Sequence, residues 1–247
     1  MPMDSIKHIA GLMDSVQRVI RDFKHNEVWW RGQPQSGKPL IPSAYRDERG
    51  WNWEQSSTTK FQRAARTRYS NCPSSDEDYP QWLFLMQHYG LPTRLLDWTE
   101  SPLIATFFAV KDESESDGEL WALNPYALNT SQIKMPILVS TRHVELQTLL
   151  RAPFFLGAEQ EEKVVAISTT EVDIRMLVQL STFTIHGTLK PLDQLEDANS
   201  FLHKFTIPAN AKEILKRDLY NIGIRDHNLF PDLEHLAAYL KQFSYPY

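Results

Sequence analysis

The sequence contains little of what forms covalent cross-links, phosphate-binding loops or membrane spans. Its 247 residues include one cysteine, Cys72, so no disulfide can form within the chain. The 9 glycines form no Walker or dinucleotide-binding loop. No apolar run reaches the length of a transmembrane helix. HExxH, paired-cysteine and GxSxG motifs are also missing, so neither a metal site nor a serine-hydrolase site is expected.

A basic surplus is missing as well. The formal net charge is -5, whereas proteins that mainly bind nucleic-acid backbone usually carry excess positive charge. This balance argues against that role but leaves room for a local basic groove. Asp4, Lys7 and His8 interrupt the stretch that a secretory signal would need to keep apolar. We therefore expect a cytoplasmic protein with no membrane partner.

Apolar periodicity predicts an α+β fold. Of the residues, 42% are hydrophobic and 23% charged, which is typical of globular proteins. Helical spacing predicts an opening helix within residues 1–24, a helix that begins at Ser101-Pro102, and further helices near 53–69, 79–89, 142–150, 172–178, 211–220 and 231–243. Strands are predicted near 27–33, 93–98, 119–124, 164–168, 182–186 and 204–207. We expect one domain over 1–247, with a mixed or mostly antiparallel central sheet, flanking helices, and C-terminal helices over 209–247 packed on the N-terminal one.

The first candidate site is the segment Trp30-Arg31-Gly32-Gln33. An arginine at a strand end can grip phosphate or carboxylate, because its planar guanidinium donates two parallel hydrogen bonds. The adjacent glycine would let a ligand approach the backbone. In an extended strand, Trp29 and Arg31 share one face. The alternative is that Arg31 pairs with an internal carboxylate such as Asp97.

The second candidate lies between a helix end and the next helix start, over residues 87–102. Unpaired backbone donors and the positive dipole end of the later helix would suit a pyrophosphate. Tyr89 and Trp98 could stack on an adenine or nicotinamide ring. The alternatives are that Arg94 and Asp97 form an internal ion pair, that Ser101 acts only as a helix cap, and that His88 is structural.

The third candidate combines Arg175 and Gln179, which lie four residues apart and so on one helix face. Gln179 could hydrogen-bond a ribose hydroxyl or a nucleobase. The alternative is a surface pair or a cap at the end of the helix.

These segments resemble the FRG domain family. Trp30-Arg31-Gly32 is similar to its aromatic-Arg-Gly signature, and the run from His88 to Thr99, continued to Phe108-Ala109, is similar to its most distinctive block. Arg175, Gln179 and Phe183, and the segment Leu229-Phe230-Pro231-Asp232-Leu233, are similar too. The resemblance extends over about residues 25–240.

The resemblance implies an ADP-ribosyltransferase-like fold with NAD as substrate and no metal. Arg31 would meet the phosphates or ribose of NAD, and Asp97-Trp98-Thr99 with Ser101 would take the place of a Ser/Thr motif. Gln179 would orient the nicotinamide ribose. The implied catalytic residues are Arg31, His88 and Gln179, and the implied NAD-binding residues are Arg31, Gly32, Gln33, His88, Tyr89, Arg94, Asp97, Trp98, Thr99, Ser101 and Arg175.

Gln179 departs from the glutamate usual in that fold, because an amide cannot carry the charge that stabilises an oxocarbenium-like centre. Either Glu171, Asp173 or Asp97 replaces it, or the protein binds a nucleotide without turnover. The leading expectation is ADP-ribosyl transfer to a protein or nucleic-acid acceptor, in a toxin or a phage-defence effector. The alternatives are a non-catalytic nucleotide- or nucleic-acid-binding module, and a hydrolase with His88 as general base oriented by Asp97.

Overall fold

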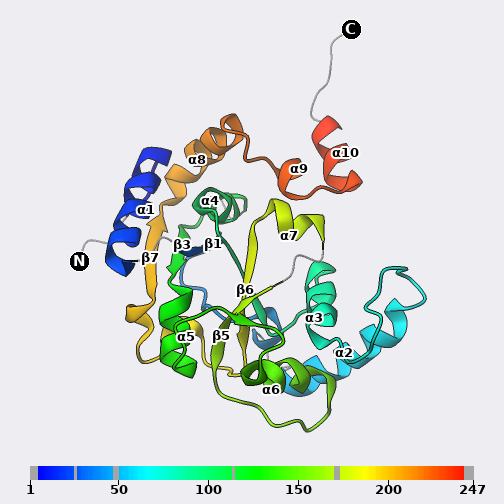
Figure 1. Cartoon of the computed structure of the whole chain (residues 1–247). Coiled ribbons are helices and arrows are strands. Elements are labelled where there is room, and N and C mark those ends of the chain that lie inside the picture. The colour runs from blue at the N-terminus through cyan, green and yellow to red at the C-terminus, as the bar shows by residue number, and fades with distance from the viewer. Residues whose placement is uncertain (1–4, 25–26, 47–49, 113–114, 170–172, 242–247) are drawn as a thin grey trace.

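The computed structural model describes residues 5–24, 27–46, 50–112, 115–169 and 173–241. Their strands form one seven-stranded sheet in the order β4-β5-β6-β2-β1-β3-β7 (Figure 1). Neighbouring strands are antiparallel except β4 and β5, which are parallel. The predicted α+β class with a mixed sheet is therefore confirmed. The strands are β1 Trp29–Gln33, β2 Leu95–Thr99, β3 Gly118–Leu123, β4 Val139–Ser140, β5 Val164–Ser168, β6 Ser181–His186 and β7 Leu202–Ile207.

One face of the sheet is covered by two separate groups of helices. Over β1, β3 and β7 lie α1 (Ile9–Phe23), α4 (Pro102–Val110) and α8 (Ala209–Asn221), around a core that includes Trp30, Leu120 and Phe205. Over β2, β5 and β6 lie α3 (Tyr79–His88) and α6 (Gln147–Arg151), around Leu95 and Phe183 among others. Figure 1 shows α4 and α3 apart from each other, above different parts of the sheet.

The opposite face carries a single core that extends from β5 to β7. It includes Trp29 of β1, Leu96 and Trp98 of β2, and Leu123 of β3, and α5 (Pro125–Ile133) covers β5 on this side. As predicted for an extended strand, Trp29 and Trp30 thus point to opposite faces. The gap between the two helix groups therefore exists on one face only.

The sheet divides at the junction of β1 and β2. These strands share a single residue pair, Trp30 with Thr99, whereas β1 pairs with β3 and β2 pairs with β6 over five residue pairs each. Beyond Trp30 the two strands separate, and the gap between the helix groups lies over this point. Where β1 and β2 are not paired, side chains can occupy space that continuous pairing of the two strands would close.

Four further helices complete the described fold. They are α2 (Gly50–Ala65), α7 (Ile174–Val178), α9 (Asp226–Leu229) and α10 (Leu233–Lys241), with short 3-10 helices at Ser43–Tyr45, Val144–Leu146, Ala152–Phe154, Leu192–Gln194 and Ala198–Ser200. Of the C-terminal helices, α8 packs beside α1, whereas α9 contacts α7 and α10. Figure 1 accordingly places α10 far from α1, and not packed on it as expected. No helix of the described ranges is both long and apolar enough to cross a membrane.

Candidate functional site

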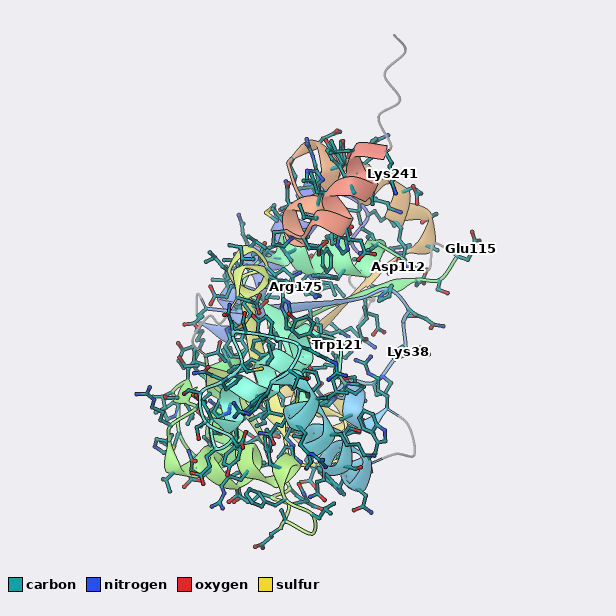
Figure 2. The ribbon with its side chains drawn as sticks, turned by 90° about the vertical axis from the view of Figure 1, so that its right-hand side faces the viewer. Lys38, Asp112, Glu115, Trp121, Arg175 and Lys241 are labelled. Carbon is teal, nitrogen blue, oxygen red and sulfur yellow. The ribbon has the colours of Figure 1, made fainter. Side chains whose placement is uncertain are left out.

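A cleft opens where the sheet divides, between α4 on one side and α3 and α7 on the other. Its main cavity has a volume of about 320 Å³. A smaller cavity of about 50 Å³ adjoins it and shares the lining residues Gln87, Asp97, Arg175, Gln179 and Ser181. We call these two cavities the split cleft. Arg175 and Asp112, which both line the main cavity, are labelled in Figure 2.

Arg31 bridges the division of the sheet. Its Nη1 donates to the main-chain oxygen of Asp97 at 2.6 Å and lies 4.0 Å from the Asp97 carboxylate. Burial lowers the pKa of Arg31 to about 10; Asp97 opposes this shift and Arg46 adds to it. Its Nε is buried and has no hydrogen-bond partner among the described residues. The positive charge of Arg31 is therefore only partly neutralised by its surroundings.

Asp97 lies at the rim of the cleft. Its side chain is 54% exposed, and its Oδ2 accepts a hydrogen bond of 2.8 Å from Gln87 Nε2. Gln87 is held in turn by Thr93, whose hydroxyl donates to Gln87 Oε1. These two hydrogen bonds fix the Asp97 carboxylate, which stays open to solvent. Although Asp97 pairs with Arg31, as considered above, its carboxylate therefore remains accessible to a ligand.

His88 pairs with Asp173 in the smaller cavity. The distance between His88 Nδ1 and Asp173 Oδ2 is 3.0 Å, and Asp173 Oδ1 caps α7 by accepting from the Met176 amide at 3.0 Å. The expectation that Asp97 orients His88 is therefore wrong. Asp173 takes that place because α7 begins beside the end of α3. Glu171, the other acidic residue considered near Gln179, lies outside the described residues.

Gln179 and Arg175 line both cavities, and each has a partner in the C-terminal segment. Gln179 Nε2 donates to the main-chain oxygen of Leu229 at 2.8 Å, and the Arg175 guanidinium lies 4.6 Å from the centre of the Phe230 ring. The main-chain oxygen of Gln179 accepts from the Thr99 hydroxyl at 2.7 Å. The amide of Gln179 thus helps to hold the segment around α9 against the cleft.

Arg94 lies in the core and not at the ligand position expected for it. It is fully buried, and its guanidinium pairs with Glu54 of α2 at 2.7 Å and donates to the Leu149 carbonyl at 3.1 Å. The alternative pairing with Asp97 is also wrong, because the partner is Glu54. Arg94 joins α2 to β2 and is absent from the lining of the cleft.

The two aromatic residues expected to stack on a ligand lie elsewhere. Trp98 belongs to the core on the opposite face of the sheet, where its Nε1 donates to Thr184 Oγ1 at 3.1 Å, and only 3% of the residue is exposed. Tyr89 is 56% exposed and packs edge-on against Tyr69, outside the cleft lining. Ser101 caps α4 through the Ile104 amide at 3.3 Å and does not line the cleft either.

Gly32 is required by helix packing. A Cβ atom at this position would lie 1.8 Å from the main-chain oxygen of Ala105 and 2.6 Å from the amide nitrogen of Ala109. The missing side chain thus allows α4 to approach β1 closely. Gly32 also lines the cleft. The missing side chain that allows the close packing would also let a ligand approach the backbone, as expected from the sequence. Gln33 lies on the other face of the sheet, in a cavity considered below.

Lys212 of α8 supports the rim of the cleft from beneath. Its side chain is fully buried, and Nζ donates to the main-chain oxygens of Pro34 at 2.6 Å and Asp112 at 3.4 Å. Both of these residues line the cleft. Sequence patterns gave no sign of this role, because a lysine in an amphipathic helix is usually exposed.

The fold and site define a class: an α+β protein whose sheet opens around a partly buried arginine, with a cleft between two groups of helices. Residues 26–118 match the family model of the FRG domain. This segment is therefore similar to the FRG domain, and it includes Arg31, the whole of β2 and α4. No curated protein and no solved structure matches the chain.

Proposed function

We propose that the split cleft binds NAD and that the protein transfers ADP-ribose from it to a protein or nucleic-acid acceptor. The observation that supports this most is the presence of two arginines, Arg31 and Arg175, in the lining of one cleft. Arginines are suited to phosphate oxygens because of their bidentate geometry. The main cavity is at the lower end of the size range of ligand pockets, about 300 to 1,000 Å³.

In this proposal Asp97 replaces the missing glutamate. Asp97 is held by Gln87 and its side chain is 54% exposed, whereas the amide of Gln179 is occupied by Leu229. In the transfer, the bond between the ribose C1′ and the nicotinamide nitrogen breaks and nicotinamide leaves as a neutral base. The acceptor forms a new bond to C1′ and loses a proton. Asp97 stabilises the positive charge on the ribose, and His88, oriented by Asp173, takes the proton.

The test combines calorimetry with NAD and a measurement of nicotinamide release. The wild-type protein is expected to bind NAD and release nicotinamide. Arg31→Gln should lose binding, while Asp97→Asn should keep binding and slow release by about 10²-fold, the usual cost of removing one electrostatic contact to the transition state. Arg217→Gln, a change at a residue of α8 whose side chain is 69% exposed, serves as a control of unchanged activity. No binding at millimolar NAD would contradict the proposal.

A second candidate is a nucleotide-binding module without turnover. The bond from Gln179 to Leu229 favours it, because the residue at the usual catalytic position is engaged in the fold. It predicts saturable binding, equal in wild type and Asp97→Asn, with no nicotinamide released over hours. The same experiment thus separates the two candidates.

A further inference from the structure

A second cavity lies along β1 and shares Arg31, Gly32 and Pro34 with the lining of the split cleft. It has a volume of about 570 Å³ and is bounded by β1, the segment that follows it and the 3-10 helix at Ser43–Tyr45. Its polar lining includes Arg31, Gln33, Lys38, Tyr45 and Arg46. We call it the basic chamber, because three of its lining residues are cations and none of the described lining residues is acidic. Lys38 is labelled in Figure 2.

Two carboxylates of the described residues near the chamber are already engaged. Glu119 stands beside Gln33 in the register of β1 and β3, but it accepts from the Gly37 amide at 3.0 Å, from Trp121 Nε1 at 3.1 Å and from Lys204 at 3.5 Å. Glu54 lies behind Tyr45 and is paired with Arg94. Arg31 is partly compensated by Asp97, so within the described part of the chain Lys38 and Arg46 carry the positive charge of the chamber that is left for a ligand to compensate.

Two buried polar atoms at the chamber have no partner among the described residues. Arg31 Nε is an unused donor, and Gln33 Oε1 is an unused acceptor on a residue that is 6% exposed. Buried polar atoms are usually hydrogen-bonded, so each calls for an explanation. A phosphate offers oxygens to a guanidinium, and a sugar hydroxyl offers a donor to an amide oxygen. The two atoms together match a sugar phosphate.

We infer that the basic chamber is a subsite for a sugar phosphate, with the phosphate between Arg31, Lys38 and Arg46 and a sugar hydroxyl on Gln33. Arg31 lines both cavities, so a ligand bound in the chamber contacts the residue that bridges the divided sheet. The inference extends the proposed function by adding a phosphate site, and it does not require that NAD is turned over. Bound phosphate would also reverse the lowering of the pKa of Arg31 that burial and Arg46 cause.

The test is calorimetric titration with ribose 5-phosphate and with inorganic phosphate at constant ionic strength. Both probes are expected to bind, ribose 5-phosphate more tightly, and ribose without phosphate is expected not to bind. Arg46→Gln and Lys38→Gln should each weaken both phosphate probes about tenfold, because each removes one charge-assisted contact. The matched controls are Arg217→Gln and Lys216→Gln on α8, where the side chains are 69% and 49% exposed. They remove the same charges and should change binding little.

Gln33→Leu tests the sugar contact. It should reduce the preference for ribose 5-phosphate over inorganic phosphate while leaving the affinity for inorganic phosphate nearly unchanged. Circular dichroism and thermal unfolding of each variant separate lost binding from lost folding. Equal weakening by the α8 controls, or no binding of either probe at millimolar concentration, would overturn the inference. If both probes bind as expected and no nicotinamide is released from NAD, the phosphate subsite is supported and the proposed transferase activity is contradicted.

Discussion

At the scale of single residues, His186 is an imidazole that the fold keeps neutral. It is fully buried, its Nε2 lies 2.9 Å from Thr184 Oγ1, and its Nδ1 has no partner among the described residues. Burial lowers its pKa to about 3, with further lowering by the cations Arg31 and Arg94. These two cations are the bridging arginine of the cleft and the buried arginine of the core.

This shift predicts how stability depends on pH. Because the pKa of His186 is lower in the folded chain than the unfolded value of about 6.5, the unfolded chain binds the proton first as the pH falls. The contribution to stability is intact above pH 6.5 and is lost as the pH falls toward 3. The free energy of unfolding should therefore fall by up to about 1.4 kcal/mol per pH unit from this group.

The measurement compares urea unfolding of wild type and His186→Asn at pH 7 and pH 4.5. Asparagine keeps a polar partner for Thr184 but does not titrate, so the variant should lose less stability between the two pH values. An equal loss in both proteins would show that His186 does not contribute. Other titrating groups are common to both proteins and cancel in the difference.

Arg94 illustrates what cannot be predicted at this scale. It lies in the block that resembles the FRG family, three residues before the cleft residue Asp97. A guanidinium that suits an anionic ligand suits an internal carboxylate equally well. Its partner Glu54 is 40 positions away, on a helix whose contact with β2 depends on the tertiary fold. Arg31, by contrast, lies in the cleft lining as its segment predicted, although it is the middle residue of β1 and not at the end of the strand.

At the scale of secondary-structure elements, the contact between α4 and β1 depends on Gly32. Gly32→Ala places a methyl group 1.8 Å from the Ala105 oxygen, so α4 must move away from the strand. We expect a loss of about 1–3 kcal/mol in the free energy of unfolding, the usual cost of overpacking, together with weaker ligand binding, because Ala105 also lines the cleft.

The control for this substitution is Gly90→Ala. Gly90 has a φ of 75° and open space around its Cβ position, so alanine there incurs only the backbone cost of about 1–2 kcal/mol and should leave binding unchanged. Thermal unfolding and calorimetry on both variants separate the two effects. If Gly32→Ala binds ligand as tightly as Gly90→Ala, the spacing of α4 and β1 does not shape the cleft.

Most elements could be predicted from local patterns. The six predicted strands are all present, and Ser101-Pro102 begins α4 as expected. The helix α5 was missed although the same signal precedes it: Asn124 caps the amides of Tyr126 and Ala127, and Pro125 follows. The strand β4 has only two residues and depends on its pairing with β5, so no local pattern marks it.

At the scale of the whole molecule, the cleft results from how the sheet is assembled. Two groups of helices cover different parts of one face, and β1 and β2 share one residue pair where they meet. Neither fact is encoded in a local pattern, because strand order and register depend on contacts between distant segments. The sequence could therefore suggest that Arg31 and Asp97 meet, but not that they meet in an opening of the sheet.

If Arg31 holds the divided sheet together, removing its side chain should loosen β2 at that point. Its hydrogen bond to the Asp97 carbonyl is a contact across the open part of the β1–β2 junction. Bonds from charged donors contribute about 1.5–3 kcal/mol, so Arg31→Ala should speed amide hydrogen exchange in residues 95–99 by about tenfold or more. The pair β3 and β7, joined by six residue pairs, should exchange as in wild type.

Arg175→Ala is the matched variant, because Arg175 lines the same cleft without bridging the strands. Unchanged exchange in residues 95–99 of Arg31→Ala would mean that the junction is held by Trp30, Thr99 and their neighbours, and that Arg31 is free to serve a ligand alone.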